Sequence, residues 1–158
     1  MVGLAFEAGS LSFEIDFQEI NRQGPSFTID TLRAVRAEVG PDACLVLIIG
    51  SDQLLNLHTW REWTKLSDYA HLAVARRVGS PVSQLSVDGE VGSIFFPRLA
   101  LARDIRSTAS GSTYLSGETF IDISATQIRK TLQEAGAQDL PVPSRVLDYI
   151  QENNLYRI

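Results

Sequence analysis

The chain has little cysteine, little histidine and no excess of basic residues. Its 158 residues include one Cys and two His, and 19 acidic side chains outnumber 14 basic ones, which gives a net charge of −5. A single Cys excludes a disulfide framework within the chain. Nucleic-acid-binding domains usually carry a basic surplus or stripe, so we expect no nucleic-acid partner.

Long hydrophobic runs are also missing. No apolar stretch approaches the ~20 residues that cross a bilayer, and the first residues lack the basic segment and long apolar stretch of a signal peptide. Cys44 lies within an apolar run, so we expect a small core residue that stays reduced. These features predict one domain over residues 1–158, located in the cytoplasm and without a membrane partner.

Hydrophobic spacing predicts alternating strands and helices. The predicted strands are 11–20, 45–49 and 71–77. A first helix is predicted that Ser26 or Thr28 can cap and that Gly40 ends. The other predicted helices are 53–68 with a break near 58–59, 125–135 with Gly136 as its stop, and 143–153. The run 45–49 is apolar throughout, which is typical of a strand buried on both faces. This order predicts an α/β fold, a Rossmann-like open sheet, mostly parallel, with flanking helices. Residues 79–118 give the least clear pattern; we expect loops at 81–92 and 107–113 and a helix near 95–106.

Gly50, Ser51 and Asp52 directly follow the predicted buried strand. Ligands of open α/β sheets bind beyond the carboxyl ends of strands, where an acidic residue can accept hydrogen bonds from ribose. Asp52 is equally suited to cap the next helix. The triplet alone favours the capping role.

Two tryptophans stand three residues apart in HTWREW. On a helix, Trp60 and Trp63 would share one face. Core packing is the expected role for one of them, and the other indole could stack on an aromatic ligand ring. Thr59 is placed to cap this helix, with Glu62 as its capping-box partner.

The segment ISATQIRK, residues 123–130, has the pattern of a helix start. Ser124 or Thr126 can cap the helix, and Arg129 lies on its first turn. First-turn N–H groups and the helix dipole attract anions, and an Arg can bind phosphate with two nitrogens. Capped helices are common, so this motif alone predicts only a helix.

The two histidines, His58 and His71, have no metal-ligand spacing with each other or with Cys44. We therefore expect structural roles for both and no protein-held metal site. The sequence also contains no P-loop, no nucleophile elbow and no CxxC pair.

Five motifs in order resemble the bacterial nicotinate mononucleotide adenylyltransferase family. They are GPSFTIDTL (24–32), LIIGSDQLLNLHTW (47–60), AHLAVARR (70–77), ISATQIRKTL (123–132) and VPSRVLDYIQENNLY (142–156). The resemblance implies a Rossmann-like nucleotidyltransferase that transfers AMP from ATP to nicotinate mononucleotide. The products are nicotinate adenine dinucleotide and pyrophosphate, a step in NAD biosynthesis. Mg²⁺ is the implied cofactor, and a homo-oligomer is an open expectation.

The resemblance also implies site residues. For nicotinate mononucleotide, Thr28 and backbone N–H groups near Trp60 and Arg61 would bind the carboxylate, and Trp60 would stack on the pyridine ring. The residues implied for ATP are Gly50, Asp52, Arg76, Arg77, Ser124, Thr126 and Arg129. Which Arg of the pair faces phosphate stays open. The pantetheine-phosphate adenylyltransferases are the alternative relatives, and GPSFTIDTL and the TW pair argue against them.

One family motif is missing. Related enzymes carry G-x-F-x-P-x-H-x-x-H, whose histidines bind ATP phosphates, and this sequence has no such motif. Met1-Val2 resembles an internal Met-Val pair of the family, so we expect that an N-terminal βαβ unit is missing. We also expect weak or no turnover by the chain as written. A non-catalytic remnant that binds a nucleotide or a partner is the alternative function.

Overall fold

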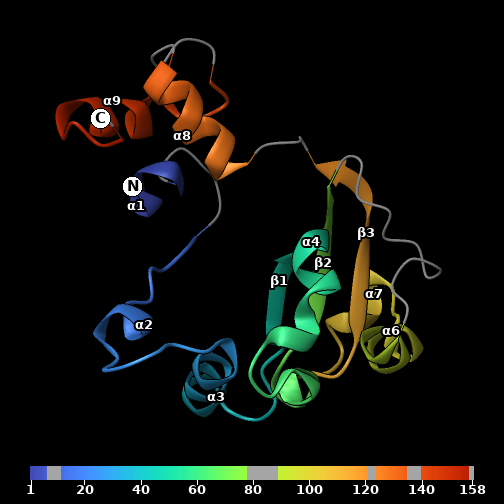
Figure 1. Ribbon diagram of the computed structural model, residues 1–158. Coiled ribbons are helices and arrows are strands. Elements are labelled where there is room, and N and C mark those ends of the chain that lie inside the picture. Colours follow the sequence, from blue (N-terminus) through green and yellow to red (C-terminus); the bar gives the residue numbers. More distant parts are fainter. Residues whose placement is uncertain (7–11, 78–88, 121–123, 135–139, 157–158) are drawn as a thin grey trace. The chain divides into compact units, whose positions relative to one another are not determined.

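The computed structural model describes residues 1–6, 12–77, 89–120, 124–134 and 140–156 (Figure 1). The chain divides into two compact units. One contains Gln18–Ile121, and the other combines Met1–Phe17 with Asp122–Ile158. Each unit is described by itself below. The single domain expected over 1–158 stays a prediction.

The larger unit contains a three-stranded parallel sheet with the order β1-β2-β3. Its strands are β1 (Val46–Gly50), β2 (His71–Arg77) and β3 (Thr113–Phe120), which run side by side in Figure 1. β1 and β2 lie within one residue of their predicted bounds. The sequence pattern missed β3, because its polar residues and Gly117 hide the alternation that marks a strand.

Helical segments, most of them short, make up the rest of this unit's described regular structure. They are α2 (Gln18–Asn21), α3 (Thr28–Val39), α4 (Ser51–Leu55), η1 (Leu57–Thr59), η2 (Trp63–Lys65), α5 (Leu66–Tyr69), α6 (Glu90–Phe95), η3 (Phe96–Arg98) and α7 (Ala102–Ile105). The interrupted helix predicted over 53–68 is thus a series of four short turns. α3 begins at Thr28, and Gly40 ends it as the sequence predicts, with a φ of 86°, a conformation that glycine adopts without strain.

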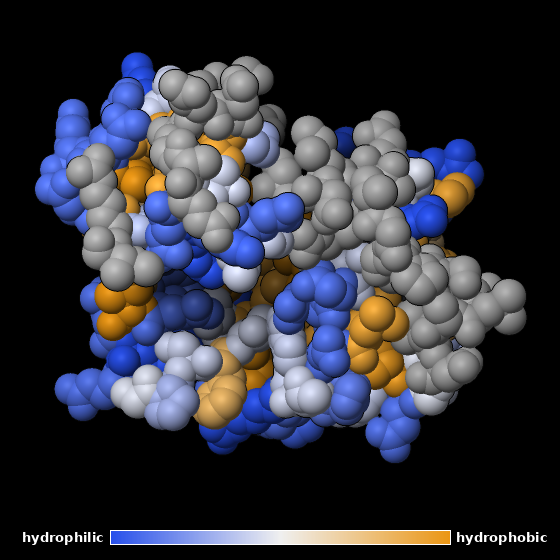
Figure 2. All heavy atoms as spheres, turned by 45° about the horizontal axis from the view of Figure 1, so that its top comes forward, coloured by the Kyte–Doolittle hydropathy of each residue, from blue (hydrophilic) through white to orange (hydrophobic). Residues whose placement is uncertain are grey.

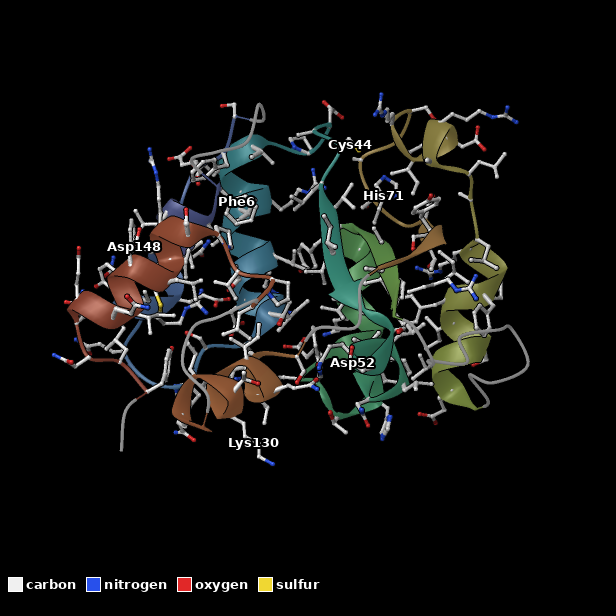
Figure 3. The ribbon with its side chains drawn as sticks, turned by 90° about the horizontal axis from the view of Figure 1, so that it is seen from above. Phe6, Cys44, Asp52, His71, Lys130 and Asp148 are labelled. Carbon is white, nitrogen blue, oxygen red and sulfur yellow. The ribbon has the colours of Figure 1, made fainter. Side chains whose placement is uncertain are left out.

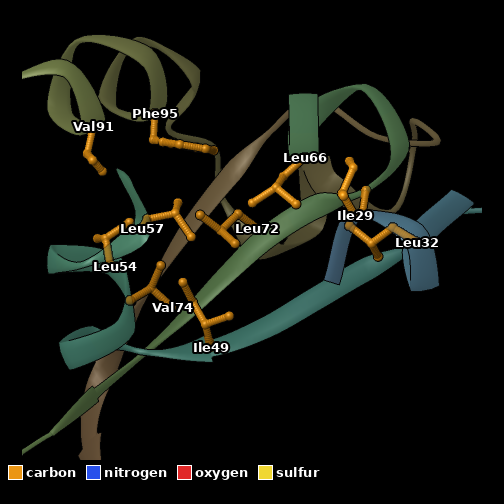
Figure 4. Close-up of a cluster of buried hydrophobic side chains, with 11 residues drawn as sticks. Ile29, Leu32, Ile49, Leu54, Leu57, Leu66, Leu72, Val74, Val91 and Phe95 are labelled. Carbon is orange, nitrogen blue, oxygen red and sulfur yellow. The ribbon is translucent and has the colours of Figure 1, made fainter. Parts of the chain in front are cut away.

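The core of this unit lies between one face of the sheet and the helices (Figure 4). The register places Ile49 beside Val74, and Val74 beside Leu115 on β3. β2 also supplies Leu72, and Ala70 precedes that strand. The members from helices are Ile29, Leu32, Leu54, Leu57, Leu66, Val91 and Phe95. Burial of such side chains stabilises a fold by about 1.5–3 kcal/mol each. The segments that follow β1 are therefore fixed to a common core.

Arg36 on α3 fastens the helix to the same unit. Its guanidinium donates hydrogen bonds to the carbonyl oxygens of Tyr69 at 2.6 Å, Ala43 at 2.6 Å and Ala109 at 2.8 Å. Five N–H donors in a rigid plane allow one Arg to satisfy several carbonyls at once. The carboxyl end of α3 is thereby held against the end of α5.

Two predictions about β1 are wrong. β1 lies at one edge of the sheet, and its alternate residue Ile48 is 73 % exposed, so the strand is not buried on both faces. Cys44 is exposed rather than part of the core. A run of apolar residues cannot reveal which face the fold leaves uncovered, because that depends on the neighbouring elements.

The strand predicted over 11–20 is also wrong where the structure describes it. Residues 12–17 have no regular structure, and Gln18–Asn21 form the helical turn α2. Leu11 lies outside the described residues. A strand needs a partner for its backbone groups, and strict alternation in the sequence does not supply one.

His71 has the structural role that the sequence predicts. It is fully buried at the start of β2, its Nε2 lies 2.8 Å from the carbonyl oxygen of Thr108, and its Nδ1 accepts the N–H of Ser112 at 3.0 Å. The two backbone partners assign the proton to Nε2. His58 lies exposed on η1, and its structural role stays a prediction.

The smaller unit contains α1 (Val2–Phe6), α8 (Ala125–Glu134) and α9 (Ser144–Glu152). α1 packs against α9, and the rings of Phe6 and Phe13 lie 5.4 Å apart. Both C-terminal helices match the predicted ones; Gly136, the expected stop, lies outside the described residues. Pro143 precedes the first turn of α9.

Apolar side chains also reach the surface. On the face drawn in Figure 2, hydrophobic residues stand in several separate places among hydrophilic ones. Within the described ranges, no helix combines the length and the apolar character needed to cross a membrane.

Candidate substrate pocket

A pocket of about 260 Å³ opens at the amino end of α3. Two short segments line it, Ser26–Thr28 from the start of α3 and Thr59–Arg61 from the end of η1. The three residues predicted for nicotinate mononucleotide, Thr28, Trp60 and Arg61, are all among them. The structure therefore brings together side chains that lie more than thirty positions apart in the sequence.

The first wall is shaped by the way α3 begins. Phe27 has an extended backbone and precedes the helix, and its carbonyl oxygen accepts the N–H groups of Asp30 and Thr31. Ser26 instead donates its hydroxyl to the carbonyl oxygen of Glu19. The predicted capping by Ser26 or Thr28 is therefore wrong, since no side chain caps α3. Thr28 is left as the first helical residue, at the pocket.

The second wall follows from the end of η1. Thr59 donates its hydroxyl to the carbonyl oxygen of Asn56 at 2.8 Å, and Trp60 adopts an extended backbone. The capping box predicted for Thr59 and Glu62 is wrong, because Glu62 has a left-handed backbone and forms ion pairs elsewhere. An extended Trp60 turns the chain out of the helical path, toward the pocket.

The two tryptophans do not share one helix. Trp60 lies after η1, and Trp63 begins η2. Both pack partly on the core, but only Trp60 lines the pocket, while Trp63 lies 6.3 Å from the ring of Phe95. The prediction of one packing indole and one indole available to a ligand agrees with this placement. Ring stacking on a ligand stays a prediction.

Arg61 connects the two walls. Its guanidinium carbon lies 4.8 Å from the centre of the Phe27 ring, within the range of a cation–π interaction. Sequence reasoning did not name Ser26, Phe27 or Thr59 as site residues. Each lies within two positions of a residue that it did name, which is the signal that would have found them.

A second group of predicted residues lies at the carboxyl end of the sheet. The register pairs Gly50 with Ala75, so Asp52, just after β1, and Arg76, near the end of β2, lie at the same end of neighbouring strands. Figure 3 shows Cys44 and Asp52 at opposite ends of β1. A Cβ atom at Gly50 would lie 2.5 Å from Asp52 Oδ1, so a side chain here would displace the carboxylate from its present position.

Arg76 differs from Arg77 in what the structure shows. Its Nε is buried, and no hydrogen-bond partner for it lies in the described part of the chain. Its backbone N–H is held by the hydroxyl of Ser116 at 3.2 Å. The side chain of Arg77 lies outside the described residues. A buried guanidinium nitrogen without a partner is suited to bind an anion.

The third group lies at the start of α8, in the smaller unit. Ser124 caps the helix, because its hydroxyl accepts the N–H of Gln127 at 3.0 Å. Of the two predicted caps, Ser124 is therefore the right one. Arg129 is exposed, and its Nη2 lies 3.4 Å from the hydroxyl of Thr126. The arrangement is the capped helix start that the sequence predicts.

Comparisons with known proteins place the chain in a family. A family model described as "Cytidylyltransferase-like" matches residues 1–131. A protein of Herminiimonas arsenicoxydans named "Probable nicotinate-nucleotide adenylyltransferase" is 42 % identical over 99 % of this chain and 72 % of its own length. A protein of Dechloromonas aromatica with the same name is 39 % identical over the same shares.

A solved structure also has a similar fold. It is a Plasmodium falciparum nicotinic acid mononucleotide adenylyltransferase complexed with NaAD, which matches 83 % of this chain with a TM-score of 0.55 and 20 % identity. The match covers 57 % of that chain. The parallel sheet with flanking helices is thus the predicted Rossmann-like fold, and the order of the five motifs carries the predicted resemblance. The chain belongs to the nicotinate-nucleotide adenylyltransferases, within the cytidylyltransferase-like family.

Proposed function

We propose that this chain binds nicotinate mononucleotide in the pocket between Ser26–Thr28 and Thr59–Arg61 and acts in AMP transfer from ATP. The reaction gives nicotinate adenine dinucleotide and pyrophosphate. The observation that carries the proposal is the meeting of Thr28, Trp60 and Arg61 around one cavity. The relatives at 42 % and 39 % identity support the same reaction by their names.

The pocket is suited to an aromatic ring that carries a carboxylate. The first-turn N–H groups of a helix lack partners within the helix, and the positive end of its dipole favours an anion. The pocket lies at this end of α3, a helix of 12 residues. A carboxylate offers acceptors only, whereas an amide also presents an NH₂ group to these donors. The acid form of the mononucleotide is therefore the preferred substrate.

The chemistry itself asks for positioning rather than for a protein nucleophile. The phosphate of the mononucleotide attacks the α-phosphorus of ATP in line, a new P–O bond forms, and pyrophosphate leaves with the bonding electrons. The co-substrate is the magnesium complex of ATP, in which phosphate oxygens and water supply most of the ligands. Trp60 and Thr28 would fix the pyridine ring, and so aim the attacking phosphate.

Two groups of residues are proposed for ATP. At the carboxyl end of the sheet, the Asp52 carboxylate beside Gly50 would accept hydrogen bonds from ribose hydroxyls. Arg76 would bind phosphate through its buried Nε, which has no hydrogen-bond partner among the described residues. We choose Arg76 over Arg77 on that observation. In the smaller unit, Ser124, Thr126 and Arg129 at the start of α8 would bind phosphate oxygens.

Calorimetric titration tests the pocket. Nicotinate mononucleotide should bind more tightly than nicotinamide mononucleotide, and Thr28→Val should narrow that difference by removing a hydroxyl beside the carboxylate. Thr131→Ala, a change on α8 of the smaller unit, is the matched control and should leave the preference unchanged. Equal affinity for the two mononucleotides, or no binding of either, would contradict the proposed pocket.

Pyrophosphate release with ATP and nicotinate mononucleotide measures turnover separately. We place the reaction in the cytoplasm, where ATP is supplied. A homo-oligomer stays a prediction, which sedimentation velocity would test.

A further inference from the structure

Glu62, the residue that follows the second pocket wall, has an unusual backbone. Its φ is 49° and its ψ is 35°, the left-handed region that glycine and asparagine visit most easily. Within the described ranges, only Asn154 and Tyr156 share a positive φ without being glycine. A glutamate stays in this conformation when contacts of its side chain hold it there. The contacts of Glu62 are therefore informative.

The carboxylate of Glu62 faces Arg33 on α3. Arg33 donates from Nη1 and Nη2 to the two carboxylate oxygens, at 3.1 and 2.8 Å. This two-atom geometry is the strongest and most directional form of an ion pair. Lys65 adds a third contact at 2.8 Å, from the neighbouring turn η2. Glu62 thus ties its loop to α3 through Arg33.

Arg33 is itself held in place. Its Nε donates to the hydroxyl of Tyr69 at 3.3 Å, its guanidinium lies 5.5 Å from the centre of that ring, and Asp30 accepts from Nη1 at 3.3 Å. A guanidinium fixed on several sides has little freedom to follow a moving carboxylate. The position of Arg33 on α3 therefore fixes the position of the loop that carries Glu62.

The positions of the pair along the chain connect it to the pocket. Arg33 lies on the helix whose first residue is Thr28, and Glu62 directly follows Arg61. Hydrogen bonds from Arg33 and Lys65 lower the pKa of Glu62 to about 2, and the pKa of Arg33 is raised by Glu62, so both are charged at neutral pH. An ion pair that is charged at neutral pH thus links α3, which carries the first wall, to the residue that follows the second wall.

We propose that the Glu62–Arg33 ion pair is a positioning device that sets the separation of the two pocket walls and thereby the affinity for nicotinate mononucleotide. The inference rests on the proposed function of the pocket. Neither residue lines the cavity, so the pair acts through Trp60 and Arg61. When the pair is lost, the backbone of Glu62 leaves the left-handed region and the Trp60 indole moves away from the pocket.

Three variants test the pair in the full chain. Glu62→Gln keeps the size and removes the charge, and Glu62→Asn removes the charge but accepts a left-handed backbone. Lys65→Gln is the matched control, because it removes the other ion-pair partner of Glu62 and leaves Arg33 in place. Nicotinate mononucleotide affinity should fall about fivefold or more in both Glu62 variants. In Lys65→Gln it should stay within about twofold.

A second measurement needs no ligand. In a Trp63→Phe background, Trp60 is the only tryptophan, and acrylamide quenching of its fluorescence reports how freely it moves. Quenching should rise in Glu62→Gln and Glu62→Asn and stay unchanged in Lys65→Gln. The quenching measurement separates the proposed role of the ion pair from the proposed function of the pocket, because it needs no ligand. If the unaltered chain binds no mononucleotide, the proposed function fails, and quenching alone then decides the role of the pair.

Three outcomes would overturn the inference. Glu62→Gln could match Lys65→Gln in both affinity and quenching. Glu62→Asn could behave like the unaltered chain, which would assign the effect to the backbone conformation. All three variants could also lose affinity in proportion to their thermal unfolding midpoint, which would indicate general destabilisation.

Discussion

The substrate pocket and the start of α8 are both predicted ligand sites, but they are built differently. The pocket has two walls, 31 residues or more apart, and each wall is fixed to the packed core of one unit. The start of α8 is a single exposed helix turn in the other unit, held by its own cap. Long-range packing shapes the pocket, and local hydrogen bonds shape the helix start.

This difference has a consequence for mutation. Core substitutions near the pocket should affect stability and binding together, because both walls pack on the core of the larger unit. Substitutions at the start of α8 should lower stability less, and their effect on hydrogen exchange should be confined to that helix.

Leu57→Ala should have the largest effect. Leu57 is fully buried in η1, two residues before the second wall, and such a truncation usually costs about 2–5 kcal/mol. The free energy of unfolding from urea titration should fall by this amount, and mononucleotide affinity should fall with it. Leu55→Ala, at a residue that is 37 % exposed, should cost under about 1 kcal/mol. Equal losses of unfolding free energy in Leu57→Ala and Leu55→Ala would contradict the claim that core packing supports the pocket wall.

Trp60→Ala should weaken nicotinate mononucleotide binding about tenfold, which corresponds to ~1.4 kcal/mol. The loss of a stacking face and of apolar contact accounts for this size. Trp63→Phe is the control, because Trp63 packs near Phe95 and does not line the pocket. Isothermal calorimetry should find its affinity within about twofold of the unaltered chain. A larger loss in Trp63→Phe than in Trp60→Ala would mean that the wrong indole was chosen.

Ser124→Ala should cost about 1 kcal/mol, the usual value of a lost helix cap. The N–H of Gln127 loses its partner, so its amide proton should exchange with solvent faster. The effect should be confined to the first turn of α8. Thr131→Ala in the same helix is the control and should leave the exchange of Gln127 unchanged. Faster exchange throughout the larger unit would contradict a local role.

The smallest effect should be a pH dependence of the Glu62 ion pairs. The pKa of Glu62 in the folded chain is about 2, below its ordinary value of 4.5, mainly through Arg33 and then Lys65. A lowered folded pKa means that the stabilisation is fully present above pH 4.5 and is lost as the pH falls toward 2. The stability difference between the unaltered chain and Glu62→Gln should therefore narrow over that range.

Urea titrations at several pH values measure this difference. Asp30 also contacts Arg33, so the same comparison in an Asp30→Asn background removes the second carboxylate. A difference that stays constant down to pH 2 would contradict the ion-pair origin of the shift.

Local rules in the sequence predicted most of the α/β order. Apolar runs located β1 and β2, and helical spacing located α3, α8 and α9. The same rules failed at β3, where polar residues hide the period, and at residues 12–17, where alternation without a partner strand leaves the chain irregular. Backbone pairing is decided by what lies alongside, which a single stretch of sequence does not contain.

The site residues divide in the same way. Resemblance to a family named Thr28, Trp60 and Arg61, because their motifs are short and contiguous. The structure decided that Ser26, Phe27 and Thr59 complete the pocket and that neither Ser26 nor Thr28 caps α3. Capping depends on backbone angles, which residue type alone does not fix.

The sequence by itself determined the family and the order of the main elements, and it supplied the residues proposed for a pyridine nucleotide. Only the tertiary structure placed Arg33 against Glu62 and left Ile48 exposed at the sheet edge. The physical reason is common to both. An ion pair between distant residues and the burial of a strand face depend on the arrangement of whole elements, and a periodic pattern records only which side chains are apolar.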